Sequence, residues 1–267
     1  GTLYPLQKRK FHSVEESILG KIRPLPFRKP SLCYNDYNIV TYFAMKLKLF
    51  GSAQTRAFRC IWMMEELNIP YELLPVMPAS TDVFQHNPSG KVPTLLVEEN
   101  EVGLGENRPL FFAVTESPVI NTFLGDRFPD SGLVPKPLSH DRLLYDQLIM
   151  KIMTELDEPL WMNRKHTELG KIFGYIPKMK EASLRQFKRA NKIISMELER
   201  SGGPFLMGSQ FTAADILYVH CLDWAKKNGW QDALRSEMVA NYFDVCRERP
   251  AYQCARELRK NDPNAKL

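Results

Sequence analysis

The chain has 267 residues, of which 44% are hydrophobic, so it is long enough to bury a sizeable core in one large domain or two smaller ones. It contains no run of roughly 18 apolar residues, the length that a membrane-spanning helix requires, and this excludes a transmembrane protein. Its five cysteines form neither a CxxC pair nor a Cys/His cluster with zinc-like spacing. The sequence therefore favours free thiols in a reducing compartment over a disulfide framework or a metal site.

The formal net charge of +5 comes mostly from the N-terminal part of the chain, where the first 48 residues carry nine Lys or Arg residues against three acidic ones. Residues 1–45 lack the aromatic and glycine pattern of an RNA-binding sheet, so we interpret them as a solvated or docking arm, with nucleic acid the least favoured partner. Because the chain begins at Gly1, we expect that a tag or a signal was removed. Removal of a transit peptide would place the protein in a mitochondrion or plastid, and the alternative is the cytoplasm.

Short elements of alternating type begin at Lys46. Residues 46–50 alternate polar and apolar side chains as a half-buried strand does. Apolar residues at helical spacing over 56–67 predict a helix that Pro70 brings to an end. Residues 71–75 predict a second strand, so the order up to this point is β-α-β.

Two further strands and a helix follow a turn at 87–93. The strands are predicted at 94–98 and 110–114, and the polar tract between them, 99–109, predicts a long protruding hairpin loop. A helix is predicted over 117–128. The first compact part of the chain, from residue 46, is therefore an α/β domain.

The proline-rich segment 129–138 predicts a linker, and the pattern after it is helical throughout. Apolar residues recur at helical spacing in four segments. These are 141–161, 176–200, 212–227 and 231–243. We therefore expect an all-α domain over 139–260 and a short tail at 261–267.

Two segments suit the binding of a ligand, one through main-chain groups and one through charged and polar side chains. At Val92–Pro93, a cis proline would offer the amide and carbonyl of Val92 to a ligand, whereas the alternative is an ordinary trans turn. At a strand-to-helix junction, Glu116 suits an ammonium group, and the Ser117 hydroxyl with the helix amides suits a carboxylate. Taken alone, this junction is equally explained as a helix cap.

The loop 51–56 leads from the first strand into the first helix. The hydroxyls of Ser52 and Thr55 lie where the helix dipole favours negative charge, so a bound thiol would be stabilised there as a thiolate. The simpler interpretation is that Thr55 caps the helix, and both roles can hold at once.

Six segments, in this order, resemble the glutathione transferase superfamily across residues 46–260. They are 49–52, 65–72, 87–93, 116–117, 211–215 and 249–252. Within them, Thr212 and Asp215 suit a capping box at the start of a helix. The resemblance implies a thioredoxin-like α/β domain followed by an all-helical domain, a cis bond before Pro93, and usually a homodimer.

Carried over by position, the resemblance places the cysteinyl backbone of glutathione on Val92, next to Pro93. It places the γ-glutamyl end on Glu116 and Ser117 and the glycyl carboxylate near Lys91, where a basic side chain faces an acid. Glutathione enters as a co-substrate, and no metal is implied.

The thiol-activating position falls at Thr55, with Ser52 as the alternative, whereas the family more often has Ser, Tyr or Cys there. A threonine hydroxyl can donate to a thiolate as serine does, and the absence of Cys argues against members that form a mixed disulfide with glutathione. A small hydrophobic electrophile is expected to bind between the domains. The candidate residues for its pocket are Glu155, Trp161, Met162, Arg164 and Trp224.

The function that the resemblance implies is the addition of glutathione thiolate to an apolar electrophile, or the reduction of a peroxide, in detoxification. The alternative is a catalytically weak or inactive member that serves as a structural or docking subunit of a larger assembly. Three features favour this alternative: Thr55 at the activating position, the loop 99–109, and a basic arm over residues 1–45 that the compact fold does not need.

Overall fold

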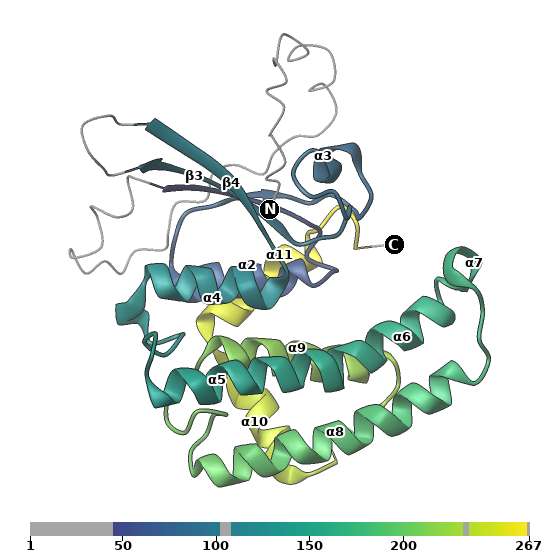
Figure 1. Ribbon diagram of the computed structural model, residues 1–267. Coiled ribbons are helices and arrows are strands. Elements are labelled where there is room, and N and C mark those ends of the chain that lie inside the picture. The colour runs from purple at the N-terminus through teal and green to yellow at the C-terminus, as the bar shows by residue number, and fades with distance from the viewer. Residues whose placement is uncertain (1–44, 102–107, 232–234, 266–267) are drawn as a thin grey trace, which may run out of the picture.

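The structure is a computed structural model that describes residues 45–101, 108–231 and 235–265. The basic arm therefore lies outside the described residues, apart from its last position. Figure 1 shows the two parts of the fold, a sheet with its helices above a layered group of longer helices. This is the expected architecture, an α/β domain of the thioredoxin-like type followed by an all-helical domain.

The first domain contains a four-stranded mixed sheet with the order β2-β1-β3-β4. Strand β1 runs parallel to β2 and antiparallel to β3, and β4 is antiparallel to β3. The strands are β1 (Met45–Phe50), β2 (Glu72–Leu74), β3 (Thr94–Glu101) and β4 (Arg108–Thr115). Because Glu101 pairs with Arg108, the loop between β3 and β4 is shorter than the predicted 99–109, and its remaining residues are not described.

Three helices complete the first domain: α2 (Ala57–Leu67), α3 (Thr81–Phe84) and α4 (Ser117–Arg127). Helices α2 and α4 lie together between the sheet and the second domain (Figure 1). Every residue of α2 from Ala57 to Met64 is buried, because the sheet covers one side of this helix and the second domain covers the other. The helix ends where Asn68 adopts a left-handed conformation with φ 51°.

The second domain is helical in all its long elements, as predicted. The elements are α5 (His140–Lys151), a π-helical segment (Ile152–Asp157), α6 (Glu158–His166), α7 (Gly170–Phe173), α8 (Met179–Ser201), α9 (Ala213–Lys227), α10 (Glu237–Glu248) and α11 (Pro250–Lys260).

Two helix predictions need correction, and one long helix was missed. The helix predicted over 141–161 is divided by the π-helical segment, and the helix predicted over 231–243 is α10, which begins later and continues to Glu248. Helix α11 was not predicted. It exists because Arg249 leaves the helical region, with ψ 134°, and Pro250 then occupies the first position of a new helix.

The predicted linker is packed against the body of the protein. Leu133 and Val134 are buried, and the Leu133 carbonyl accepts a hydrogen bond of 2.8 Å from the amide of Ala213. The predicted capping box is confirmed at this end of α9, where the Thr212 amide donates to the Asp215 carboxylate at 2.8 Å. The segment between the domains therefore holds the start of α9 in place.

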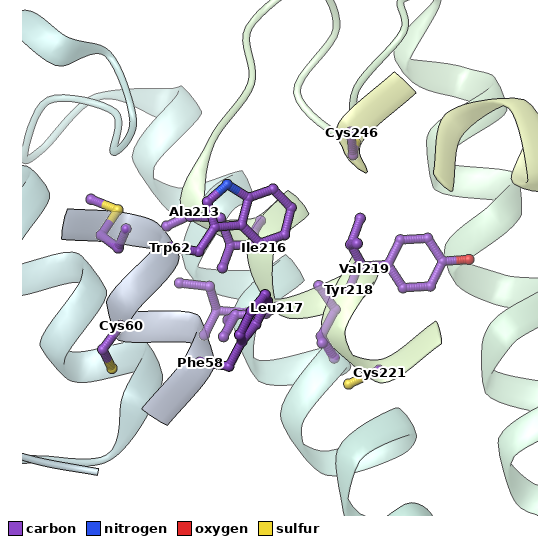
Figure 2. Close-up of a cluster of buried hydrophobic side chains, with 14 of the residues drawn as sticks. Phe58, Cys60, Trp62, Ala213, Ile216, Leu217, Tyr218, Val219, Cys221 and Cys246 are labelled. Atoms are coloured by element: carbon purple, nitrogen blue, oxygen red, sulfur yellow. The ribbon is translucent and has the colours of Figure 1, made fainter. Parts of the chain in front are cut away.

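One hydrophobic core runs through both domains. Figure 2 shows side chains of α2, among them Phe58 and Trp62, packed against the buried face of α9. The Tyr252 ring of α11 lies 4.9 Å from the Trp62 ring and 5.7 Å from the Phe58 ring, centre to centre. None of the helices in the described ranges is long and apolar enough to cross a bilayer.

Candidate active site

Three of the segments singled out in the sequence meet at one end of the sheet. Because Thr94 lies opposite Thr115 in the β3–β4 pair, Val92 and Ser117 are carried to the same end. Gly51, directly after β1, belongs to this end as well, since a Cβ on it would lie 3.2 Å from the Val92 Cβ. The structure thus brings together the loop after β1, the turn before β3 and the start of α4.

The main-chain amide and carbonyl of Val92 are without hydrogen-bond partners among the described residues at this site. The Val92–Pro93 peptide bond is cis, as the resemblance implied. The ladder of β3 begins at Thr94, and neither the amide nor the carbonyl of Val92 makes a hydrogen bond to the residues that the structure describes. The turn is held by Asn87, whose side-chain amide donates to the Lys91 carbonyl at 2.9 Å. Both groups of Val92 are therefore available to a ligand.

The junction of β4 and α4 offers two different polar groups. Glu116 has a φ of 65°, a strained value for a residue other than glycine, and its exposed carboxylate has no partner among the described residues. Ser117 is buried, and its Oγ accepts a hydrogen bond of 3.2 Å from Nη1 of Arg59. The Ser117 proton is thereby left for another acceptor.

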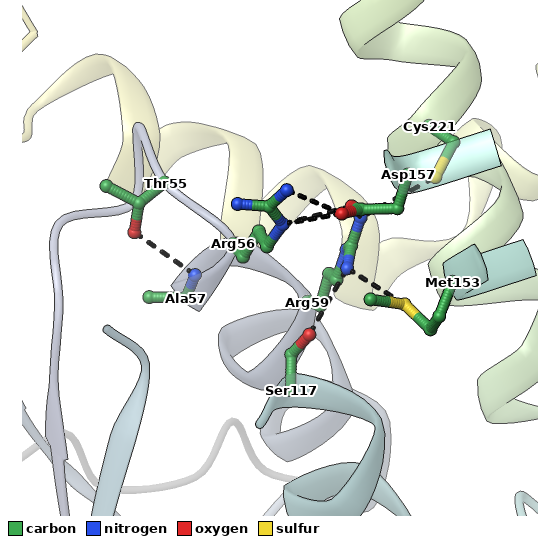
Figure 3. Close-up of polar contacts among 8 residues, drawn as sticks. All are labelled: Thr55, Arg56, Ala57, Arg59, Ser117, Met153, Asp157 and Cys221. Carbon is green, nitrogen blue, oxygen red and sulfur yellow. Dashed lines mark hydrogen bonds and ion pairs between the residues drawn. The ribbon is translucent and has the colours of Figure 1, made fainter. Parts of the chain in front are cut away.

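Arg59 of α2 is the buried centre of the site. Its guanidinium is fully buried and donates to Ser117, to the Asp157 carboxylate, to the Met153 sulfur at 3.4 Å and to the Cys221 sulfur at 3.5 Å (Figure 3). Burial alone would raise the pKa of Asp157, but the nearby arginines outweigh it, so the pKa is held below its usual value. Asp157 is therefore ionised and joins the two domains.

The guanidinium of Arg56 also forms an ion pair with Asp157. Its Nε and Nη2 donate to the carboxylate at 2.9 and 2.5 Å. Its guanidinium carbon lies 5.4 Å from the ring centre of Trp161 and 5.0 Å from that of Trp224. In Figure 3 its remaining nitrogen points away from Asp157.

Two of the five residues predicted for the co-substrate pocket, Trp161 and Trp224, are thus brought together at the start of α2. Glu155 is exposed and Arg164 pairs with Glu168 at 3.4 Å. Neither of these two, nor Met162, makes a hydrogen bond, ion pair or ring contact with Arg56 in the described part of the chain.

The hydroxyl groups of the loop after β1 are already engaged. Thr55 Oγ1 donates to the Ser52 carbonyl at 2.7 Å and accepts from the Ala57 amide at 3.2 Å, so it binds the first amide of α2 from the position before the N-cap residue, Arg56. Ser52 is fully buried, and its hydroxyl donates to Asp262 at 3.0 Å. The main-chain amide of Arg56, at the N-terminus of α2, has no partner among the described residues.

The same loop is held by a C-terminal clamp, residues 259–262. The Asp262 carboxylate accepts from the Ala53 amide at 2.6 Å, and Arg259 Nε donates to the Ala53 carbonyl at 2.9 Å. In return, Gln54 donates its side-chain amide to the Arg259 carbonyl at 2.7 Å. The loop is thus fixed by residues from the far end of the chain.

Sequence reasoning missed Arg59, Asp157 and Asp262. Arg59 carries a signal that was available, because it interrupts the apolar run of α2 and a buried arginine requires an acidic partner. The sequence holds no comparable signal for the other two. Cys60 of α2 is fully buried, and burial raises the pKa of its thiol, so it is a core residue of this helix.

Comparison with known proteins covers both domains. Residues 55–127 match the family model described as glutathione S-transferase, N-terminal domain, and residues 171–252 match the one described as glutathione S-transferase, C-terminal domain. A search of curated protein sequences finds no match.

The chain is also similar to solved structures. A glutathione transferase from Methylococcus capsulatus strain Bath has 23% identity and a TM-score of 0.64, with 80% of this chain and 99% of that chain covered. A family member from Pseudomonas fluorescens with two glutathione bound has 21% identity and a TM-score of 0.65, with 79% and 92% covered. URE2P6 from Phanerochaete chrysosporium, in complex with oxidized glutathione, has 19% identity and a TM-score of 0.65, with 81% and 97% covered. At these identities the likeness concerns the fold.

Proposed function

The chain belongs to the glutathione transferase superfamily, and from this premise we propose that it binds glutathione at the site around Val92 and transfers the bound thiolate to an electrophile. The observation that carries the proposal is the unpaired amide and carbonyl of Val92, which lie at the same end of the sheet as Ser117. A peptide-like ligand can pair with both groups as an added strand does.

The ends of glutathione find groups of suitable charge around Val92. The Ser117 hydroxyl, fixed by Arg59, directs its proton to the γ-glutamyl carboxylate, and the exposed Glu116 carboxylate faces the ammonium group. Lys91 is exposed and suits the glycyl carboxylate. Together these contacts bind the tripeptide along its length.

Activation of the thiol is proposed at the N-terminus of α2. The Arg56 amide is unpaired there, and it is the donor that the structure leaves available to a thiolate. The Thr55 hydroxyl can donate to the sulfur only by giving up its bond to the Ser52 carbonyl. Ser52 is the weaker candidate, since its hydroxyl is buried against Asp262.

In the reaction, the thiol proton leaves to solvent and the sulfur forms a bond to an electrophilic carbon, from which the leaving group departs with the bonding electrons. With a hydroperoxide as acceptor, the sulfur takes the terminal oxygen, an alcohol is released, and a second glutathione reduces the sulfenic acid. The indole rings of Trp161 and Trp224 flank Arg56 and favour an aromatic or otherwise flat acceptor.

Calorimetric titration of the protein with glutathione tests the proposal directly. We expect Ser117→Ala to weaken binding by about tenfold or more, because a hydrogen bond to a charged group is lost. The control is Ser195→Ala, a partly exposed serine on α8 whose hydroxyl bonds only to its own helix. Turnover is measured with 1-chloro-2,4-dinitrobenzene. Absence of heat with the wild-type protein would refute the proposal.

A second candidate function, a glutathione-binding member with little or no catalysis, is favoured by the engaged Thr55 hydroxyl. It predicts binding of glutathione without turnover of several electrophiles, and no gain of activity in Thr55→Ser. A docking role for residues 1–45, a homodimer, and a mitochondrial, plastid or cytoplasmic location remain predictions.

A further inference from the structure

The α7 tip, residues 171–178, exposes an unusual number of large apolar side chains. All of its residues are exposed. Four of them are large and apolar: Ile172 is 73% exposed, Phe173 44%, Tyr175 67% and Ile176 41%. Figure 1 shows α7 beyond the end of α6, at the margin of the molecule. Contiguous exposed apolar side chains of this kind mark interaction surfaces.

Hydrogen bonds and a ring contact hold the backbone of the α7 tip in place. The Ile176 amide donates to the carbonyl of the buried His166 at 3.1 Å. The Nδ1 of His166 donates in turn to the Gly174 carbonyl at 2.8 Å, and the Phe173 ring packs edge-on against Trp161 at 6.0 Å. The backbone that carries the apolar side chains is therefore already fixed, so binding of a partner would cost little further conformational entropy.

The α7 tip is surrounded by positive charge. Lys171, Lys178 and Lys180 are exposed and form no ion pair with the described residues. The acidic residues on either side of the α7 tip, Glu168 and Glu181, each pair with an arginine four residues away, Arg164 and Arg185. The lysines are thus uncompensated, and the surface suits an anionic partner.

We propose that the α7 tip docks this protein onto a membrane surface that contains anionic lipids. Ile172, Tyr175 and Ile176 would enter the boundary between headgroups and acyl chains, while the lysines bind the headgroups. A stable protein–protein interface needs roughly 20–30 residues a side, more than this narrow projection offers. A bilayer requires only a few inserted side chains and nearby positive charge. The proposal does not depend on glutathione binding.

Vesicle sedimentation tests the proposal with the full chain. The vesicles contain phosphatidylcholine alone or mixed with phosphatidylserine. We expect binding to the mixed vesicles that weakens as salt is raised. The variant Ile172→Ser/Tyr175→Ser should lower the apparent affinity by about tenfold or more. The variant Lys171→Gln/Lys178→Gln should lower it by about fivefold for each lysine.

The control is Val245→Ser, which changes an exposed apolar residue of α10, 44% exposed and outside the α7 tip, and should bind as the wild type does. The proposal is overturned if the wild type does not bind the mixed vesicles. It is also overturned if the two double variants bind as the wild type does, because another surface, such as residues 1–44, is then responsible. Should the apolar variant prove less stable in thermal unfolding, the lysine variant decides the question.

Discussion

At the scale of single residues, the site is organised by one carboxylate that faces two guanidinium groups. Asp157 pairs with both Arg56 and Arg59, so the cluster retains a surplus of positive charge beside Ser117. An arginine suits the central position better than a lysine would, because its planar fork can reach Asp157 and Ser117 at the same time. The surplus charge favours an anionic group of the ligand at Ser117.

The variant Asp157→Asn tests the importance of this cluster. It leaves the fully buried Arg59 without a counter-charge, and we expect the free energy of unfolding to fall by about 3–5 kcal/mol, measured in urea at pH 7. The control is Glu197→Gln, which removes a partly exposed ion pair with Lys151 and should cost less than about 1 kcal/mol. A loss no larger than that of the control would contradict the prediction.

The same variant gives a prediction for the pH dependence of the unfolding free energy. The pKa of Asp157 is lower in the folded protein than its ordinary value of 3.8, so the ionised carboxylate contributes its full stability above that pH. The contribution is lost as the pH falls through the lower folded pKa. The difference in unfolding free energy between wild type and Asp157→Asn should therefore shrink in urea titrations below pH 3.8. The prediction is contradicted if the difference in unfolding free energy between the two proteins grows as the pH falls.

At the scale of elements, two irregular segments position the site. The π-helical segment Ile152–Asp157 carries both Met153 and Asp157 to Arg59, and such wide turns occur often at functional positions. The C-terminal clamp, residues 259–262, holds the loop after β1 through both main-chain groups of Ala53. The Ala53 amide donates to Asp262, and the Ala53 carbonyl accepts from Arg259. Neither segment belongs to the sheet on which the ligand groups lie.

We expect Asp262→Ala to loosen the loop after β1. The change leaves the buried Ser52 hydroxyl and the Ala53 amide without an acceptor, at a cost of about 1–3 kcal/mol for each group. Amide hydrogen exchange should become faster over residues 51–57. Asp262→Asn keeps an acceptor oxygen and should restore much of the protection, while Asn261→Ala, an exposed neighbour, should change nothing. Unchanged exchange in Asp262→Ala would show that the clamp does not hold the loop.

The order of elements in the first domain was predictable from sequence because its signals are local. The alternation over 46–50 and the stop at Pro70 each depend on residues only a few positions apart, and so does the capping box at Thr212 in the second domain. The pairing of Ser52 with Asp262 spans 210 positions, and no local pattern encodes it. The start of α11 was missed because Pro250, which ends one helix, also begins the next.

Among the predicted ligand residues, the structure brings together those that flank strands, because strand pairing fixes their relative positions. Val92 and Ser117 follow directly from the register of β3 and β4. Four of the co-substrate candidates are predicted from their position near the end of one helix, and Trp224 from the helix that begins at the capping box. Which of the four faces Arg56 depends on the π-helical segment, which shifts the phase of the helix and was not predictable from periodicity.

At the scale of the whole molecule, the two domains share one core. The rings of Phe58 and Trp62 from the first domain pack against Tyr252 and the face of α9 from the second, and all of these side chains are buried. Exposing this face in either domain alone would return large apolar surfaces to water. The domains therefore stabilise each other.

We expect the protein to unfold in urea as one cooperative unit. Hydrogen exchange measured across a urea series should give the same midpoint for peptides from β3 and from α9. Tyr252→Ala, which removes a ring between the domains, should lower both midpoints together. The control Tyr175→Ala changes an exposed ring of the second domain and should leave both midpoints unchanged. Two separate midpoints in the wild type would contradict the prediction.

Because the C-terminal clamp is near the end of the chain, the loop after β1 can be fixed only late in synthesis. The loop after β1 leaves the ribosome early, but its partner Asp262 is added 210 residues later. At about 5–20 residues per second, the loop waits roughly 10–40 s for its acceptor while the apolar face of α2 remains uncovered. The ligand site of the first domain is therefore completed only after most of the polypeptide has been translated.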